Sequence, residues 1–162
     1  MHELPSWLKH ATIWLLLATG LFVAVLAWQK SQSQSRLVVE GGTLVIQRSA
    51  DGHYHWPGQV DGREVDFLID TGATGTAIPS ALAQELGLQA VDRMRSSTAG
   101  GVVQGTVVVA DLELQGGLRA ERLRMTALPK LQAPLLGMDV LGKLRWQQAD
   151  GVMRIELRPA RP

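Results

Sequence analysis

The stretch FLIDTGAT, residues 67–74, places an acidic residue at the end of an apolar run. A carboxylate at the end of a buried strand is costly unless another group pairs with it or uses it, and this singles out Asp70. Gly72 lets the backbone turn sharply and lets another chain approach closely, and the Thr71 hydroxyl can bond a neighbouring main chain. The tripeptide alone also fits a plain Asx turn. Its flanks add specificity, because an apolar strand precedes it and Ala-Thr and a predicted helix follow it.

Around this stretch the sequence predicts short strands joined by tight turns. Apolar residues alternate through Val65, Phe67 and Ile69, as in a strand with one buried face. The dipeptides Asp51-Gly52 and Asp61-Gly62 are typical of hairpin turns. Further strands are predicted at 37–39, 44–47, 53–60, 107–114, 118–128 and 152–157, helices at 78–88 and 139–144, and a glycine-rich mobile loop or hairpin tip at 96–105. Many short strands with little helix indicate an all-β barrel or sandwich.

A second element, PLLGMDVLGKL at residues 134–144, lies downstream of the first. Together the two segments resemble the signatures of the retropepsin-like (retroviral-type, clan AA) aspartic proteases, and most of all the bacterial members with an N-terminal membrane anchor. The resemblance covers residues 54–157 and implies a closed β-barrel with one or two short helices. Retroviral enzymes often carry an acidic residue soon after the first motif and an arginine after the second. Here Thr74–Thr76 and Met138-Asp139 occupy those places, so the resemblance does not carry over that ion pair.

The resemblance implies that Asp70, Thr71 and Gly72 form the catalytic loop. Aspartic protease chemistry needs two carboxylates around one water, yet the sequence contains no second Asp-Thr-Gly or Asp-Ser-Gly. Two chains must therefore each supply one Asp70, in a two-fold homodimer. Two carboxylates a few ångströms apart keep one proton between them. The ionised member then takes a proton from the water, and the neutral member donates to the scissile carbonyl oxygen.

The same resemblance implies roles for residues around this loop. The Thr71 hydroxyls brace the two loops across the axis, and Gly137 lets the second motif pack under the loop. The supporting residues are Ala73, Leu136 and Gly137, and the flap that closes over an extended peptide has its tip at Ala99, Gly100, Gly101 and Val102. No metal and no cofactor are expected.

The composition excludes several other functions. The chain has 162 residues, no cysteine and a formal net charge of +1. Without cysteine it has no disulfides, thiolate metal ligands or cysteine nucleophile, and the charge balance argues against a nucleic-acid partner. The glycine-rich phosphate loops and the HExxH and GxSxG motifs are absent. His53 and His55 alternate on one predicted strand, but two histidines do not make a metal site, and we expect both at the surface.

Residues 11–28 form an uncharged apolar run. As a helix such a run reaches about 27 Å, close to the thickness of a bilayer's hydrocarbon core. Trp7 and Trp28 lie near its ends, where interfacial aromatic residues are found. We therefore expect a membrane anchor here. The alternatives are a cleaved signal peptide with its small-residue site at 25–27 and a buried core helix.

The expected domain organisation follows from these segments: a short tail at 1–10, a transmembrane anchor at 11–28, a polar linker at 29–35 and the protease domain at 36–162. The expected function is a membrane-anchored aspartic endopeptidase that acts as a homodimer on extended peptide or protein substrates. We place it in the bacterial inner membrane with its protease domain in the periplasm. The alternative is a non-catalytic peptide-binding or scaffolding module of the same fold in the cell envelope. A third hypothesis, an unrelated β-barrel with a chance Asp-Thr-Gly, is disfavoured by the second motif.

Overall fold

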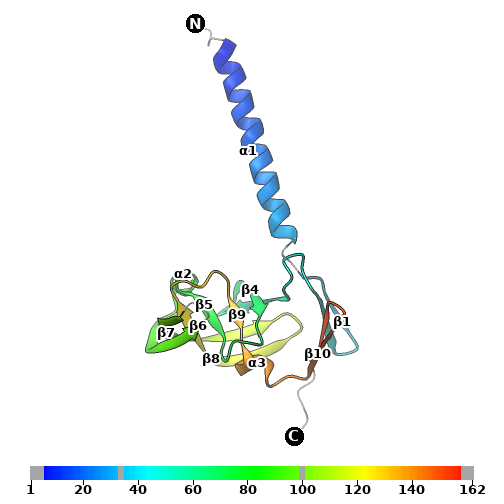
Figure 1. Cartoon of the computed structure of the whole chain (residues 1–162), viewed down its shortest axis with the longest axis vertical. Helices are drawn as coiled ribbons and strands as arrows, with labels where there is room; N and C mark the ends of the chain where they lie inside the picture. The colour runs from blue at the N-terminus through cyan, green and yellow to red at the C-terminus, as the bar shows by residue number, and fades with distance from the viewer. Residues whose placement is uncertain (1–5, 33–34, 99–100, 158–162) are drawn as a thin grey trace. The chain divides into compact units, whose positions relative to one another are not determined.

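The computed structural model describes residues 6–32, 35–98 and 101–157 (Figure 1). By its internal contacts the chain divides into two compact units, Met1–Gln34 and Ser35–Pro162. The first unit contains one helix, and the second contains all the described strands.

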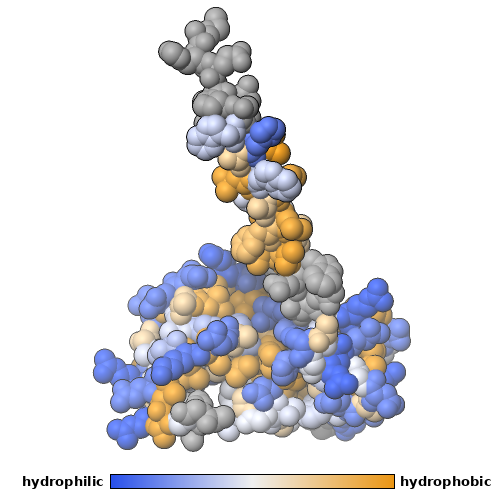
Figure 2. Space-filling view, turned by 45° about the horizontal axis from the view of Figure 1, so that its top comes forward, coloured by the Kyte–Doolittle hydropathy of each residue, from blue (hydrophilic) through white to orange (hydrophobic). Residues whose placement is uncertain are grey.

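The helix of the first unit is α1, Ser6–Gln32. The large apolar side chains that the structure describes on it are exposed, from 43% for Val25 to 71% for Trp14, and many are coloured orange in Figure 2. In the part of the chain that the structure describes, no helix combines the length and the apolarity needed to span a membrane. The transmembrane prediction for residues 11–28 is therefore not confirmed. The side chains of residues 27 and 28, the last two of the predicted anchor, lie outside the described part.

The second unit contains two sheets and two short helices. The four-stranded sheet has the order β1-β2-β11-β10, and the seven-stranded sheet has the order β3-β4-β9-β5-β8-β7-β6. The strands of the first sheet are β1 Leu37–Glu40, β2 Thr43–Gln47, β10 Trp146–Ala149 and β11 Val152–Glu156. The strands of the second are β3 His55–Val60, β4 Arg63–Ile69, β5 Ala77–Pro79, β6 Ala90–Thr98, β7 Gly101–Leu114, β8 Leu118–Leu128 and β9 Leu135–Leu136. The helices are α2 Ser80–Glu85 and α3 Met138–Leu141.

The seven-stranded sheet turns back on itself. Strand β3 pairs with β4, and over Gly58–Val60 it also pairs with β7. At this crossing a Cβ on Gly58 would lie 2.6 Å from the carbonyl oxygen of Glu113, so the close approach requires glycine. The prediction of a mostly β fold with short helices is confirmed. The four-stranded sheet was not foreseen as a separate layer, and closure of the other sheet into a barrel stays a prediction.

Strand β4 has the alternation that the sequence predicts. Val65, Phe67 and Ile69 are buried, with exposed fractions of 6%, 0% and 8%. Trp56 of β3 lies opposite Phe67 in the register and is also fully buried. Burial of one such large apolar side chain contributes about 1.5–3 kcal/mol. This packing fixes β4 in the core, and the residue that directly follows β4 is Asp70.

The helix predicted over 78–88 is shorter than expected. Ala77–Pro79 form strand β5, which pairs in parallel with β8 through Ile78 and Ala127, and only Ser80–Glu85 are helical. Ile78 is fully buried, so its place in the sheet overrides the local helical pattern. Gly87, with a φ of +70°, closes the helix as predicted.

The glycine-rich segment at 96–105 belongs to a long hairpin. Strands β6 and β7 pair antiparallel as far as Thr98 and Gly101. The hairpin alternative is therefore confirmed, and a mobile loop over the whole segment is wrong. Residues 99 and 100 lie outside the described part of the chain.

Candidate active site

Asp70 begins a tight loop, residues 70–76, called the Asp70 loop below. The Asp70 N–H donates to the carbonyl oxygen of Leu136 at 3.1 Å, and the Ala73 N–H donates to the carbonyl oxygen of Asp70 at 3.2 Å. The Gly72 N–H donates to the Oδ1 atom of the Asp70 carboxylate at 2.9 Å. Asp70 is half-buried, whereas Thr71 and Gly72 are exposed. The loop thus holds one carboxylate oxygen by a main-chain donor and presents its tip to solvent.

Strand β9 lies beside β4 and delivers the second motif to this loop. The two strands pair in parallel, with Leu136 opposite Ile69, and Leu136 is fully buried. The next residue, Gly137, packs directly on the backbone of Gly75. A Cβ on Gly137 would lie 2.4 Å from the Gly75 carbonyl carbon, which is closer than real Cβ contacts come. The contact is therefore possible only because residue 137 is a glycine, which has no side chain.

The start of helix α3 ties down the far half of the Asp70 loop. The N–H groups of Met138 and Asp139 donate to the carbonyl oxygens of Ala73 and Thr74, at 2.9 and 3.1 Å. Ala73 is half-buried by this contact, while Thr74 remains exposed. The loop is thus fixed by β9 at one end and by α3 at the other.

A buried threonine connects the same two segments through its side chain. Thr76 is 0% exposed, and its hydroxyl donates to Oδ1 of Asp139 at 2.8 Å. The Gly137 N–H donates to the same hydroxyl oxygen at 3.3 Å, and the Val140 N–H donates to Asp139 Oδ1 at 3.0 Å. No pattern in the sequence indicated a role for either Thr76 or Asp139. This hydrogen-bond bridge ties the Asp70 loop to the start of α3.

Replacing Thr76 by valine is expected to lower the free energy of unfolding by about 1–3 kcal/mol, because the buried Gly137 N–H then loses an acceptor. Valine keeps the shape of threonine, so packing changes little. Urea unfolding of the full-length chain would measure the effect. The matched control is Thr74→Val at an exposed position, where we expect a change of less than about 0.5 kcal/mol. Equal losses in both variants would contradict a role for the bridge.

Two of the four residues predicted to form the flap lie on strand β7 of the β6–β7 hairpin. Gly101 and Val102 begin β7, and Val102 is 71% exposed. Ala99 and Gly100 lie outside the described residues. Among the described residues of the second unit, Asp70 lines none of three surface hollows of about 530, 400 and 850 Å³. Contact between the hairpin tip and a substrate stays a prediction.

The model of a family described as "gag-polyprotein putative aspartyl protease" matches residues 56–143. The chain belongs to this family. The matched residues contain both the Asp70 loop and the β9–α3 segment that packs on it. Two uncharacterised bacterial proteins each align with 91% of the chain. One, from a Sinorhizobium species, is 27% identical and is covered over 72% of its length; the other, from Rickettsia prowazekii, is 26% identical and is covered over 67%.

Solved structures show the same fold. A retropepsin-like aspartic protease from Rickettsia conorii superposes with a TM-score of 0.57 at 20% identity, over 75% of this chain and 93% of that chain. The EIAV protease in complex with the inhibitor HBY-793 superposes with a TM-score of 0.50 at 17% identity, over 65% of this chain and 92% of that chain. The second unit of this chain therefore has a retropepsin-like fold.

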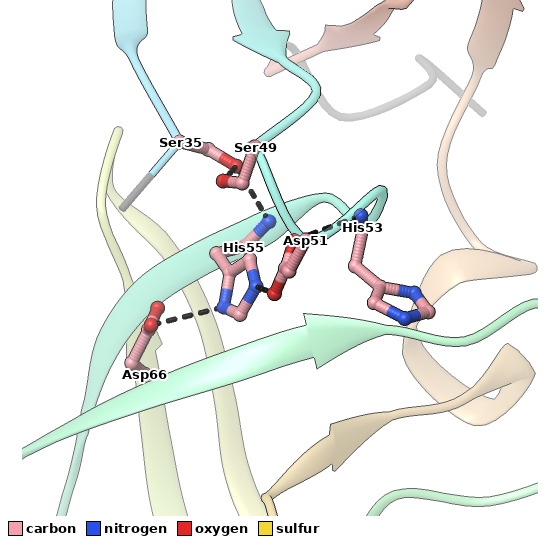
Figure 3. Close-up of polar contacts among 6 residues, drawn as sticks. All are labelled: Ser35, Ser49, Asp51, His53, His55 and Asp66. Atoms are coloured by element: carbon pink, nitrogen blue, oxygen red, sulfur yellow. Dashed lines mark hydrogen bonds and ion pairs between the residues drawn. The ribbon is translucent and has the colours of Figure 1, made fainter. Parts of the chain in front are cut away.

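A second polar cluster lies on β3, the neighbour of β4 (Figure 3). The Nδ1 atom of His55 lies 3.0 Å from a carboxylate oxygen of Asp66, and its Nε2 atom lies 2.8 Å from one of Asp51. The main-chain N–H of His55 donates to the Ser35 hydroxyl at 2.8 Å. His55 is buried, so its predicted surface position is wrong. Among the residues that the structure describes, no group of three or more histidine or acidic side chains is arranged to hold a metal ion.

The two carboxyl groups of this cluster shift in opposite directions. Burial acts to raise the pKa of Asp51, but hydrogen bonds from the His53 N–H and the His55 ring, with the charges of both histidines, outweigh it and hold the pKa below its ordinary value. Burial raises the pKa of Asp66 by more than the neighbouring His55 lowers it, and the charge of Asp51 adds to the rise. Asp51 therefore stabilises the fold when ionised, whereas ionisation of Asp66 costs stability.

The sign of these shifts predicts how stability depends on pH. A carboxyl group whose pKa is lower in the folded state stabilises the fold at pH values above its pKa in the unfolded state. That stability is lost as the pH falls through its pKa in the folded state. Asp51→Asn is therefore expected to destabilise at pH 7, by less than about 1 kcal/mol because solvent screens the pair, and to have little effect near pH 3. The raised pKa of Asp66 has the opposite sign, so Asp66→Asn should cost less than Asp51→Asn at pH 7. Urea unfolding at several pH values would test this; a larger loss for Asp66→Asn at pH 7 would contradict it.

Proposed function

We propose that this chain is an aspartic endopeptidase that works as a homodimer, with one Asp70 from each chain. The observation that carries the proposal is the Asp70 loop, in which a main-chain N–H holds the carboxylate while β9 and α3 fix the loop from below. Membership of an aspartyl protease family and the retropepsin-like fold support the same reaction. Because the sequence has one Asp-Thr-Gly, the second carboxylate must come from a second chain.

The reaction proceeds by general acid–base catalysis on an extended peptide. Two carboxylates that face each other across the axis hold one proton between them, and the pair titrates as a unit. The ionised member takes a proton from the bound water, whose oxygen attacks the scissile carbonyl carbon. The neutral member donates its proton to the carbonyl oxygen, and the roles reverse when the amine leaves. In this proposal the hydroxyl of Thr71, which is exposed at the loop tip, bonds the partner's loop.

Cleavage of an unfolded protein tests this proposal. Full-length wild-type and Asp70→Asn chains are incubated with casein between about pH 3 and 7, and the products are identified by mass spectrometry. We expect the substitution to lower the rate by about a thousandfold or more, because both proton transfers are lost. Asp150→Asn, in an exposed turn, is the matched control and should leave the rate unchanged. Absence of cleavage by folded, dimeric wild-type protein would instead favour the non-catalytic peptide-binding module.

We also propose that α1 attaches the protease to a membrane, with the second unit on the periplasmic side of a bacterial inner membrane. The exposed apolar side chains of α1 and the bacterial relatives support this. Fractionation with a carbonate wash would test the attachment, and digestion of spheroplasts with an added protease would test the orientation. Recovery of the chain in the soluble fraction would contradict attachment. Protection of the domain in spheroplasts would contradict a periplasmic position.

A further inference from the structure

A groove of about 850 Å³ lies between the first part of β8 and the segment that contains α3. Its floor consists of half-buried apolar side chains that pack against the core of the second unit. These are Leu118, Ala120, Leu123, Leu144 and Leu157. Such side chains along a concave surface leave apolar surface area that a binding partner could bury.

Cationic side chains surround this apolar floor. The groove is lined by five of them, Arg119, Arg122, Arg124, Lys143 and Arg145, against two carboxylates, Glu121 and Asp139. The Asp139 carboxylate already accepts the hydroxyl of Thr76. Arg119 and Arg124 form exposed ion pairs with Glu113 and Asp92, at 3.0 and 3.5 Å. Among the described residues the structure records no ion pair for the other three cations. The groove is therefore basic, although the whole chain has a net charge of only +1.

The groove also exposes an unpaired strand edge. Strand β8 pairs with β7 on one side from Leu118 to Ala127, with a register shift at Glu121 and Arg122. On the other side β5 pairs only with Thr126–Leu128. Within the described residues no strand pairs with that second side over 118–124. Free main-chain donors and acceptors at such an edge can bind an extended segment as an additional strand.

We infer that this groove docks an extended protein segment in which acidic and apolar residues alternate. Successive side chains of a strand point to opposite sides, so apolar residues would cover the floor while acidic residues meet Arg122, Lys143 and Arg145. A flat anionic lipid surface would match the charge, but neither the concave floor nor the free strand edge. The chain's own last residues, RPARP at 158–162, are basic and carry the wrong charge. Docking here adds an attachment point for a protein partner and does not depend on peptide cleavage.

Binding of a designed peptide tests the inference. The full-length chain carries Asp70→Asn to prevent cleavage and is held in phosphatidylcholine nanodiscs. The probe is a fluorescent peptide of about ten residues in which glutamate and leucine alternate, and fluorescence anisotropy measures its binding. We expect the combined Arg122→Glu and Lys143→Glu substitutions to weaken binding about tenfold or more. The matched control, Arg63→Glu with Lys130→Glu, makes the same charge change at exposed positions outside the groove and should alter binding less than about twofold.

Further arms of the experiment separate the alternatives. A peptide with lysine in place of glutamate, and one with N-methyl groups on alternate residues, should both fail to bind. The milder pair Arg122→Gln and Lys143→Gln, which keeps the shape of the groove, should weaken binding in the same direction. Equal binding by groove and control variants would overturn the inference. So would a groove variant that loses only its binding to phosphatidylglycerol vesicles, or only its self-association by crosslinking, because a membrane or a second copy would then be the occupant.

Discussion

Asp70→Asn chains are expected to inhibit wild-type chains when the two are expressed together. If each active site needs one Asp70 from each of two chains, only wild-type pairs are fully active, and their share is the square of the wild-type fraction. With about nine variant chains for each wild-type chain, the activity per total chain should fall to about one-hundredth of the wild-type value. A site completed within one chain would instead keep about one-tenth, in proportion to the wild-type fraction.

The measurement requires the chain ratio as well as the rate. Two tags distinguish the chains, mass spectrometry gives their proportions, and cleavage of casein gives the activity across several ratios. Co-expression of Asp150→Asn chains is the control, because that carboxylate lies in an exposed turn and its loss should cause no inhibition. A linear dependence on the wild-type fraction would contradict the homodimer while leaving the protease itself intact.

Local patterns in the sequence predicted much of this molecule. The alternation of Val65, Phe67 and Ile69 identified β4, because strict alternation of apolar and polar residues is typical of a strand with one buried face. The Asp61-Gly62 dipeptide marked the hairpin between β3 and β4, and both residues have the positive φ that such turns require. These signals lie within a few residues of one another. They located Asp70 at the end of a strand before any tertiary contact was known.

Contacts between distant segments were beyond these patterns. Thr76 and Asp139 are 63 positions apart in the sequence. Neither residue type predicts that the other will lie beside it. His55 was expected at the surface, yet Asp51 and Asp66 contact its ring from two different segments. Ile78 shows the same limit, since its strand forms because β8 and β9 lie on either side of it. The sequence thus located the loop but not the hydrogen bonds that support it.

Among the glycines that the structure describes, Gly137 is the one at which an added methyl group, in Gly137→Ala, is expected to have the largest effect. Gly137 has φ −94° and ψ −177°, an extended conformation that alanine adopts freely, so the cost is purely steric. The new Cβ would lie 2.4 Å from the carbonyl carbon of Gly75, 2.6 Å from its oxygen and 2.9 Å from its Cα. These are backbone atoms of the Asp70 loop, which must move. Overpacking of this kind costs about 1–3 kcal/mol, and a displacement of about 1 Å near a reacting group lowers activity about a hundredfold.

Gly75→Ala is the matched control, because it adds the same methyl group to the residue that Gly137 contacts. A Cβ on Gly75 meets nothing within 4 Å, so we expect a loss of less than about 0.5 kcal/mol. Stability by urea unfolding and casein cleavage at a temperature where both variants remain folded would separate displacement of the loop from unfolding. If folded Gly137→Ala kept full activity, the support of the Asp70 loop by β9 could not be what positions the carboxylate. If it lost activity while Gly75→Ala kept it, the direction of the methyl group would be the cause, since both variants carry the same added atoms.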